Sequence, residues 1–156
     1  MTDRLTIVEA TGGKGSICRE LLASLPEWFG IPDAVEAYVA AVDHLPMLVA
    51  RVGGEVVGFL SLNFHTGAAA EAYVLGVTPA WQRQGIGTRL FVAASAFAKA
   101  RGCKYISVKT LAAAHPDPHY RATRLFYEAI GFDRIEVFPA LWGAENPCLL
   151  MLKRLD

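Results

Sequence analysis

The segment Gln82-Arg-Gln-Gly-Ile-Gly-Thr88 decides the fold, because it joins a predicted strand to an amphipathic helix. Its two glycines allow a ligand to approach the backbone, and the first turn of a helix offers unpaired N–H groups that bind phosphate. Two common phosphate motifs do not fit. The chain has no GxxxxGK run, and the third glycine position of a dinucleotide fingerprint holds Leu90. The segment therefore predicts a phosphate-binding turn, with a helix start and incidental glycines as the alternative.

The flanking sequence predicts alternating strands and helices. A strand over 70–77 precedes the turn, and a helix over 85–100 with regularly spaced apolar residues follows it. Gly76 predicts a bulge or a close backbone approach within its strand, and Gly53-Gly54 predicts a hairpin. The order indicates an α/β or α+β fold with helices packed on a sheet. The other expected elements are strands over 5–9, 47–52, 56–63, 105–110, 132–138 and 148–153, and helices beginning at Ser16, Asp33 and Asp117.

The composition indicates one domain over residues 1–156. Apolar residues make up 53% of the chain and charged residues 19%, which excludes disorder. No apolar run approaches the roughly 20 residues of a membrane span, so no membrane partner is expected. Fifteen basic residues balance fifteen acidic ones, which argues against a nucleic acid held by bulk charge. Residues 81–130 nevertheless carry eight basic and only two acidic side chains, which suits a small polyanionic ligand.

The three cysteines, Cys18, Cys103 and Cys148, form no CxxC pair, and the first residues contain no apolar signal region. Both features indicate a reducing, cytoplasmic location. The sequence contains no zinc-ligand spacing, so we expect no metal. The cysteines are interpreted as buried thiols, and covalent catalysis through Cys103 or Cys148 is the weaker alternative.

Two segments together resemble the GNAT N-acetyltransferase superfamily. The turn of residues 82–88, after a strand that ends in Gly-Val-Thr-Pro, is similar to the family's acyl-CoA pyrophosphate loop. The segment Thr123-Arg-Leu-Phe-Tyr-Glu-Ala-Ile-Gly-Phe132 is similar to the family's FYExxGF helix and strand. The resemblance implies a mixed, mostly antiparallel sheet with helices on both faces. In that sheet the fourth and fifth strands, over 70–77 and 105–110, would be splayed apart.

The resemblance also implies acetyl-CoA as co-substrate. The pantetheine arm would pair with the backbone of residues 75–77, where an unpaired N–H group could hold the thioester oxygen. The pyrophosphate would bind the N–H groups of residues 83–88. Tyr120 stands where many family members have an asparagine, and a phenol cannot supply the donor and acceptor of an amide. The cofactor-binding residues expected on this basis are Leu75, Gly76, Val77, Gln82, Arg83, Gln84, Gly85, Ile86, Gly87, Thr88 and Tyr120.

Tyr127 is the candidate proton donor. It matches the tyrosine of the family's FYE segment, which protonates the departing CoA thiolate, and the alternative is a packing tyrosine. On a helical wheel, Tyr127 falls away from the apolar stripe that includes Leu125, Phe126 and Ala129. The wheel therefore predicts that Tyr127 points away from the core.

Glu71 is the candidate base. An alkyl ammonium must lose a proton before it can attack, and several family members place a glutamate at this strand position. The alternatives are an ordinary surface carboxylate at Glu71 and a reaction in which water is the base. His65, His115 and His119 are further candidates, because imidazoles titrate near neutral pH.

These residues predict an N-acetyltransferase that moves an acetyl group to the primary amine of a small molecule by direct attack in a ternary complex. Trp28, Phe29, Tyr73 and Trp142 are expected to line the acceptor site, or else to close the ends of the core. The acidic balance of residues 1–80 favours a cationic amine. The alternatives are a non-catalytic acyl-CoA sensor, a protein or peptide amine as acceptor, and a longer acyl donor. The family resemblance also makes a homodimer possible.

Overall fold

The first of two compact units is built on an antiparallel hairpin. The computed structural model describes residues 4–156, and this unit contains residues 4–63 and 73–97. β1 (Leu5–Glu9) pairs with β2 (Met47–Val52), and β2 pairs with β3 (Glu55–Phe64). Gly53 and Gly54 join β2 to β3 with φ values of 57° and 84°, the positive values that a type I′ turn requires. The predicted hairpin is confirmed.

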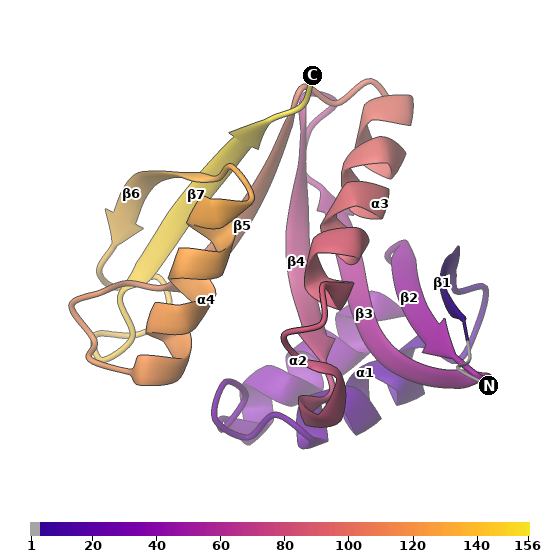
Figure 1. The fold of residues 1–156 in the computed structure, drawn as a ribbon. Coiled ribbons are helices and arrows are strands. Elements are labelled where there is room, and N and C mark those ends of the chain that lie inside the picture. The colour runs from indigo at the N-terminus through magenta and orange to yellow at the C-terminus, as the bar shows by residue number, and fades with distance from the viewer. Residues whose placement is uncertain (1–3) are drawn as a thin grey trace. The chain divides into compact units, whose positions relative to one another are not determined.

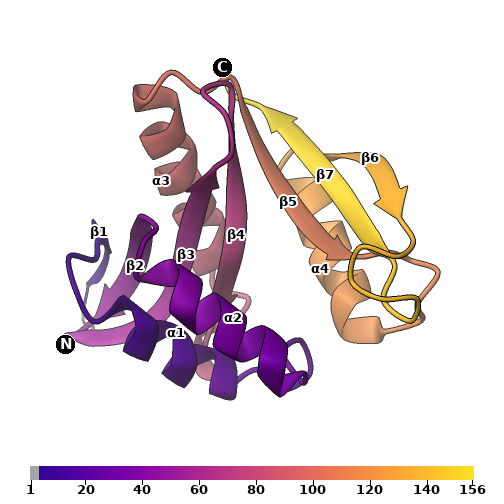
Figure 2. The same ribbon diagram turned by 180° about the vertical axis from the view of Figure 1, so that it is seen from behind.

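Helices cover both faces of the strands in the first unit. α1 (Lys14–Ala23) and α2 (Pro32–Val42) lie on one face, and α3 (Ile86–Ala100) lies on the other (Figures 1 and 2). The helix starts predicted at Ser16 and Asp33 are wrong. α1 follows Gly13, whose φ is 65°, and α2 has proline in its first turn, where its fixed φ suits a helix. Neither start uses a side-chain cap.

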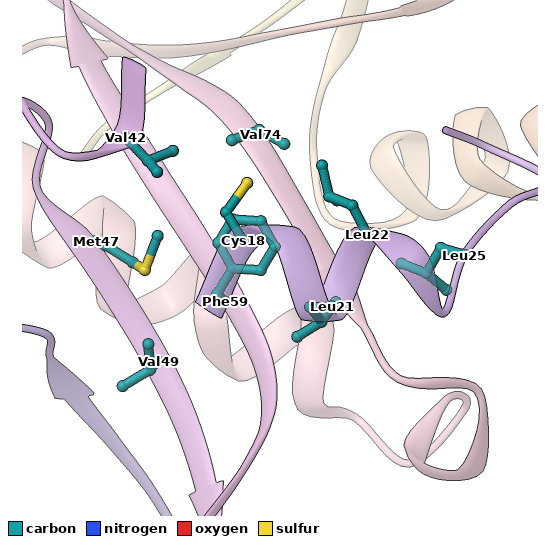
Figure 3. Packing of buried hydrophobic residues seen from close by; sticks show 9 residues of the cluster. All are labelled: Cys18, Leu21, Leu22, Leu25, Val42, Met47, Val49, Phe59 and Val74. Atoms are coloured by element: carbon teal, nitrogen blue, oxygen red, sulfur yellow. The ribbon is translucent and has the colours of Figure 1, made fainter. Parts of the chain in front are cut away.

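The core of the first unit lies between α1, α2 and the strands (Figure 3). A Cβ atom at Gly76 of β4 (Ala69–Val77) would lie 2.7 Å from Leu25 Cδ1 and 2.8 Å from Leu21 Cδ2. The sequence predicted a bulge or a close backbone approach at Gly76, whereas the structure places leucine side chains against it. The buried residues of this cluster are Cys18, Leu21, Leu22, Leu25, Val42, Met47, Val49, Phe59 and Val74.

The second unit contains residues 64–72 and 98–156. Residues Ala69–Glu71 of β4 pair in parallel with Tyr105–Ser107 of β5 (Tyr105–Leu111). β7 (Cys148–Arg154) lies between β5 and β6 (Asp133–Phe138), antiparallel to both. α4 (Pro118–Ala129) packs against β5 (Figure 1). It begins as predicted, because the carboxylate of Asp117 accepts the first backbone N–H groups of the helix.

The seven strands hydrogen-bond in the order β1-β2-β3-β4-β5-β7-β6. The β1–β2, β2–β3, β5–β7 and β6–β7 pairs are antiparallel, and the β4–β5 pair is parallel. The mixed, mostly antiparallel sheet is therefore confirmed, whereas a single domain over residues 1–156 stays a prediction. In the described part of the chain, no helix has both the length and the apolar character needed to cross a membrane.

Candidate active site

The turn of residues 82–88 is held by its own glutamine side chains. It follows a short 3₁₀ helix, η1 (Pro79–Trp81), after β4. Gln82 Nε2 donates to the carbonyl oxygen of Val77 at 3.0 Å, and Gln84 Nε2 donates to that of Ala80 at 3.2 Å. Both bonds tie the turn to the chain that precedes it, so the backbone before α3 has a defined conformation.

Two residues of this turn have left-handed backbone. Arg83 has a φ of 61° and Gly85 a φ of 81°. For arginine this conformation costs on the order of 1–3 kcal/mol, and such strain concentrates at ligand sites. Nothing lies within 4 Å of the position of a Cβ atom at Gly85. α3 begins directly afterwards, and the first N–H groups of a helix have no intrahelical partner. The first N–H groups of α3 and the positive end of its dipole thus follow directly on the open position at Gly85, an arrangement that suits an anion.

Residues Leu75–Val77, predicted to pair with a pantetheine arm, lie at the end of β4 in the first unit. The Val77 carbonyl accepts a hydrogen bond from Gln82 Nε2. Gly76 is buried beneath the side chains of Leu21 and Leu25, whereas Leu75 and Val77 are half-buried. The pairing with pantetheine stays a prediction.

Three of the four residues expected to line an acceptor site lie in one aromatic cluster of the first unit. The ring of Tyr38 lies edge-on to Phe29, with 6.0 Å between centroids, and to Tyr73 at 5.2 Å. Trp28 packs against the same core, partly buried. Tyr38 was not predicted as part of this group, and only its helical spacing from Val35 could have suggested that it faces inward. Trp142 lies in the β6–β7 loop of the second unit and is 38% exposed.

The Glu71 carboxylate lies within a charged cluster of the second unit. Its Oε1 atom is 2.6 Å from His65 Nε2, and its Oε2 atom accepts from Lys109 Nζ at 3.0 Å. The Glu71 side chain is only 6% exposed, so the reading as an ordinary surface carboxylate is wrong. The sequence did not point to Lys109, and it suggested His65 only as an alternative base.

The helical-wheel prediction for Tyr127 is wrong. Tyr127 is 5% exposed and Leu125 is 52% exposed, so α4 turns its tyrosine inward and its leucine outward. The centroid of the Tyr127 ring lies 5.8 Å from that of the Phe132 ring. One turn earlier, the buried Arg124 donates from Nη1 to the Leu111 carbonyl at 2.7 Å. Burial lowers the pKa of Arg124, and the nearby cations Arg134 and Arg121 add to that shift. The role of Tyr127 as proton donor stays a prediction.

The remaining candidates lie near the start of α4. Tyr120 is half-buried in its first turn, and its backbone N–H donates to Asp117. His119 Nδ1 lies 3.5 Å from the Asp117 carboxylate. His115 Nδ1 is buried and has no hydrogen-bond partner in the part of the chain that the structure describes.

The cysteines are buried in the core. Burial raises the pKa of both Cys18 and Cys148 to about 11, so both are thiols at neutral pH. A thiol is a poor nucleophile compared with a thiolate. This argues against covalent catalysis through Cys148. Among residues 4–156, no group of three His, Cys, Asp or Glu side chains could hold a metal ion.

Comparisons with known proteins agree with this architecture. A family model described as the acetyltransferase (GNAT) domain matches residues 43–134. N-alpha-acetyltransferase RimI of Mycobacterium tuberculosis is 30% identical over 142 residues, which cover 86% of this chain and 82% of that protein. The chain belongs to the GNAT acetyltransferase family, and it is an acyltransferase.

Two solved structures show the same fold. A GNAT-family protein from Desulfovibrio desulfuricans superposes with a TM-score of 0.83 at 17% identity, covering 98% of this chain and all of that one. An aminoglycoside 6′-N-acetyltransferase in complex with coenzyme A superposes with a TM-score of 0.76 at 21% identity, covering 97% of both chains. The similarity extends over nearly the whole chain.

Proposed function

We propose that this protein transfers the acetyl group of acetyl-CoA to a primary amine by direct attack in a ternary complex. The observation that carries the proposal is the turn of residues 82–88. It combines two left-handed residues, glutamine anchors and the N-terminus of α3, and these features suit the diphosphate of CoA. The complex of the aminoglycoside acetyltransferase with coenzyme A supports the same ligand class.

The acceptor we place first is the α-amine of a peptide or protein. The relative from Mycobacterium tuberculosis carries the name N-alpha-acetyltransferase, and it is more similar in sequence than the structural neighbours described above. A small-molecule amine is the second candidate. The excess of acidic over basic residues in the range 1–80 favours a cationic acceptor of either kind.

Glu71 and Tyr127 take the roles of base and acid in this proposal. Glu71 accepts a proton from the acceptor ammonium, and Tyr127 returns a proton to the sulfur that leaves. For an alkyl amine, deprotonation at pH 7 costs about 4–5 kcal/mol, whereas a peptide α-amine with a pKa near 8 costs about 1 kcal/mol. The loss on Glu71→Gln should therefore be larger with alkyl amines than with peptides.

Thiol release over a panel of acceptors tests the proposal. Peptides with free N-termini, the same peptides blocked at the N-terminus, polyamines and aminoglycosides form the panel. We expect acetyl-CoA turnover with free peptides and none with blocked ones. Turnover with polyamines or aminoglycosides but not with peptides would instead identify a small-molecule amine as the acceptor. Turnover with no amine of the panel would count against the proposal.

Substitution of Trp28 and Trp142 tests whether these side chains line the acceptor site. If they line it, Trp28→Ala and Trp142→Ala should raise the KM for the acceptor, because each buries apolar area against it at roughly 25 cal/mol per Å². Binding of acetyl-CoA, measured by calorimetry, is the internal control and should change little. A lower melting temperature with unchanged kinetics would instead assign both tryptophans to the core. The homodimer and the cytoplasmic location stay predictions.

A further inference from the structure

The buried carboxylate of Glu71 contacts two side chains that are more exposed than itself, His65 and Lys109. The side chain of Glu71 is 6% exposed, that of Lys109 is 29% exposed and that of His65 is 53% exposed. The imidazole contacts one carboxylate oxygen, and the ammonium contacts the other. The two contacts differ in kind, because at neutral pH an imidazole exchanges protons readily and an ammonium does not.

The positions of the three side chains follow from the local backbone. Glu71 lies opposite Ser107 in the parallel β4–β5 pair, and Lys109 follows two residues later on the same face of β5. His65 directly follows β3 and precedes β4, within the connection between them. The lysine compensates the charge of a carboxylate that would otherwise be buried alone, at a large cost in free energy. Lys109 therefore holds the carboxylate, which leaves His65 available to exchange protons.

A base that removes one proton per turnover must return it to solvent. Glu71 has little exposed surface through which to do so directly. We propose that His65 relays the proton from Glu71 to water. The inference rests on the proposed function, because it takes Glu71 as the base of the acetyl transfer.

The relay balances as a sequence of proton transfers. An N–H bond of the acceptor ammonium breaks and an O–H bond forms on Glu71, leaving a neutral amine. The proton then passes from Oε1 to His65 Nε2, which restores the carboxylate and gives an imidazolium. The imidazolium loses its Nδ1 proton to water. At rest, Nε2–H then donates to the Glu71 carboxylate, which can only accept. When Glu71 next takes up a proton, exchange of the ring protons with solvent gives the Nδ1–H tautomer that accepts on Nε2.

The other groups described near Glu71 are poor acceptors for its proton. On β5 the neighbour is Lys109, and on β7 it is Cys148, whose pKa is raised by burial to about 11. Next to His65 in the chain, the Phe64 ring packs beneath the guanidinium of Arg101 at 4.7 Å. Neither a guanidinium nor a protonated lysine accepts a proton at neutral pH. His65 is thus the proton acceptor on the solvent side of Glu71.

Multiple-turnover kinetics at low buffer concentration test the relay. His65→Ala should lower kcat by about tenfold or more, within the range of general acid–base contributions, and leave the KM for acetyl-CoA unchanged. Added imidazole should restore kcat in proportion to its concentration, because a diffusible base replaces the lost side chain. His44→Ala removes an exposed histidine just after α2, and it should behave as the wild type, with no dependence on imidazole.

A second variant separates the relay from a structural role. His65→Gln keeps a hydrogen-bond donor beside Glu71 but cannot carry a proton, so it should lower kcat as His65→Ala does while melting at the wild-type temperature. Wild-type kcat in His65→Gln or His65→Ala would overturn the relay, and so would a loss in His65→Ala that imidazole does not restore. If the wild type itself acetylates no amine, the proposed function fails instead.

Discussion

Substitution at Gly85 separates phosphate binding from folding. A side chain at a φ of 81° costs roughly 1–2 kcal/mol of stability, whatever its chemistry. It meets no protein atom, since nothing lies within 4 Å of the Cβ position. Gly85→Ala and Gly85→Glu should therefore be destabilised by similar amounts, and both should remain folded.

The two variants should differ in acetyl-CoA affinity. A carboxylate about 4 Å from a phosphate oxygen repels it by about 1 kcal/mol in bulk water and by about 4 kcal/mol at an effective dielectric constant of 20. Gly85→Glu should thus bind acetyl-CoA about fivefold to about a thousandfold more weakly than Gly85→Ala.

Isothermal titration calorimetry measures both affinities, with urea denaturation as the control for folding. The interaction is electrostatic, so the gap between the two variants should narrow as salt is raised. Equal affinity in Gly85→Glu and Gly85→Ala at low salt would show that the diphosphate does not bind at this turn.

Three further predictions concern packing, the proton donor and alkaline stability. Gly76→Ala should lower the free energy of unfolding by about 1–3 kcal/mol, because its Cβ atom would overlap the side chains of Leu21 and Leu25. Gly67→Ala, whose Cβ atom would meet nothing within 4 Å, is the control in the same urea titration. Tyr127→Phe should lower kcat with little change in the KM for acetyl-CoA, since the bond to the leaving sulfur matters mainly in the transition state, and a change in KM alone would argue for a packing role. For Cys148, whose folded pKa is about 11 against an ordinary value of 9.0, stability should be constant below about pH 9 and fall by up to about 3 kcal/mol as the pH rises to about 11. Urea titrations across this range should show a smaller alkaline loss in Cys148→Ala, and an equal loss would contradict the assignment.

The sequence correctly predicted those elements whose turn or start is determined by a few neighbouring residues. Gly53-Gly54 specifies a hairpin turn through its backbone freedom, and Asp117-Pro118 specifies a helix start through a side-chain acceptor. The starts of α1 and α2 lack such a cap, so the polar residues nearby were misleading. In α2, Glu36 pairs with Arg19 of α1 instead of capping its own helix.

The sequence did not reveal which side of α4 is buried or which residues contact Glu71, because both depend on tertiary contacts. The helical wheel placed Leu125 in the core, but the buried residues of α4 are Tyr127 and Arg124. The guanidinium of Arg124 is accommodated there by its hydrogen bond to the Leu111 carbonyl. The neighbours of Glu71 lie 6 and 38 positions away. The more distant of the two depends on the parallel β4–β5 register, which no local pattern specifies.

The central claim is that this protein acetylates an amine, and mass spectrometry of the acceptor tests it most directly. Purified protein, acetyl-CoA and a peptide with a free N-terminus are incubated, with Glu71→Gln and Gly85→Glu as parallel samples. We predict one acetyl group on the α-amine, formed in equal amount to the CoA released, and less product with either variant. Binding of acetyl-CoA without acetylation of peptide, polyamine or aminoglycoside would contradict the claim and identify a protein that binds acetyl-CoA without using it.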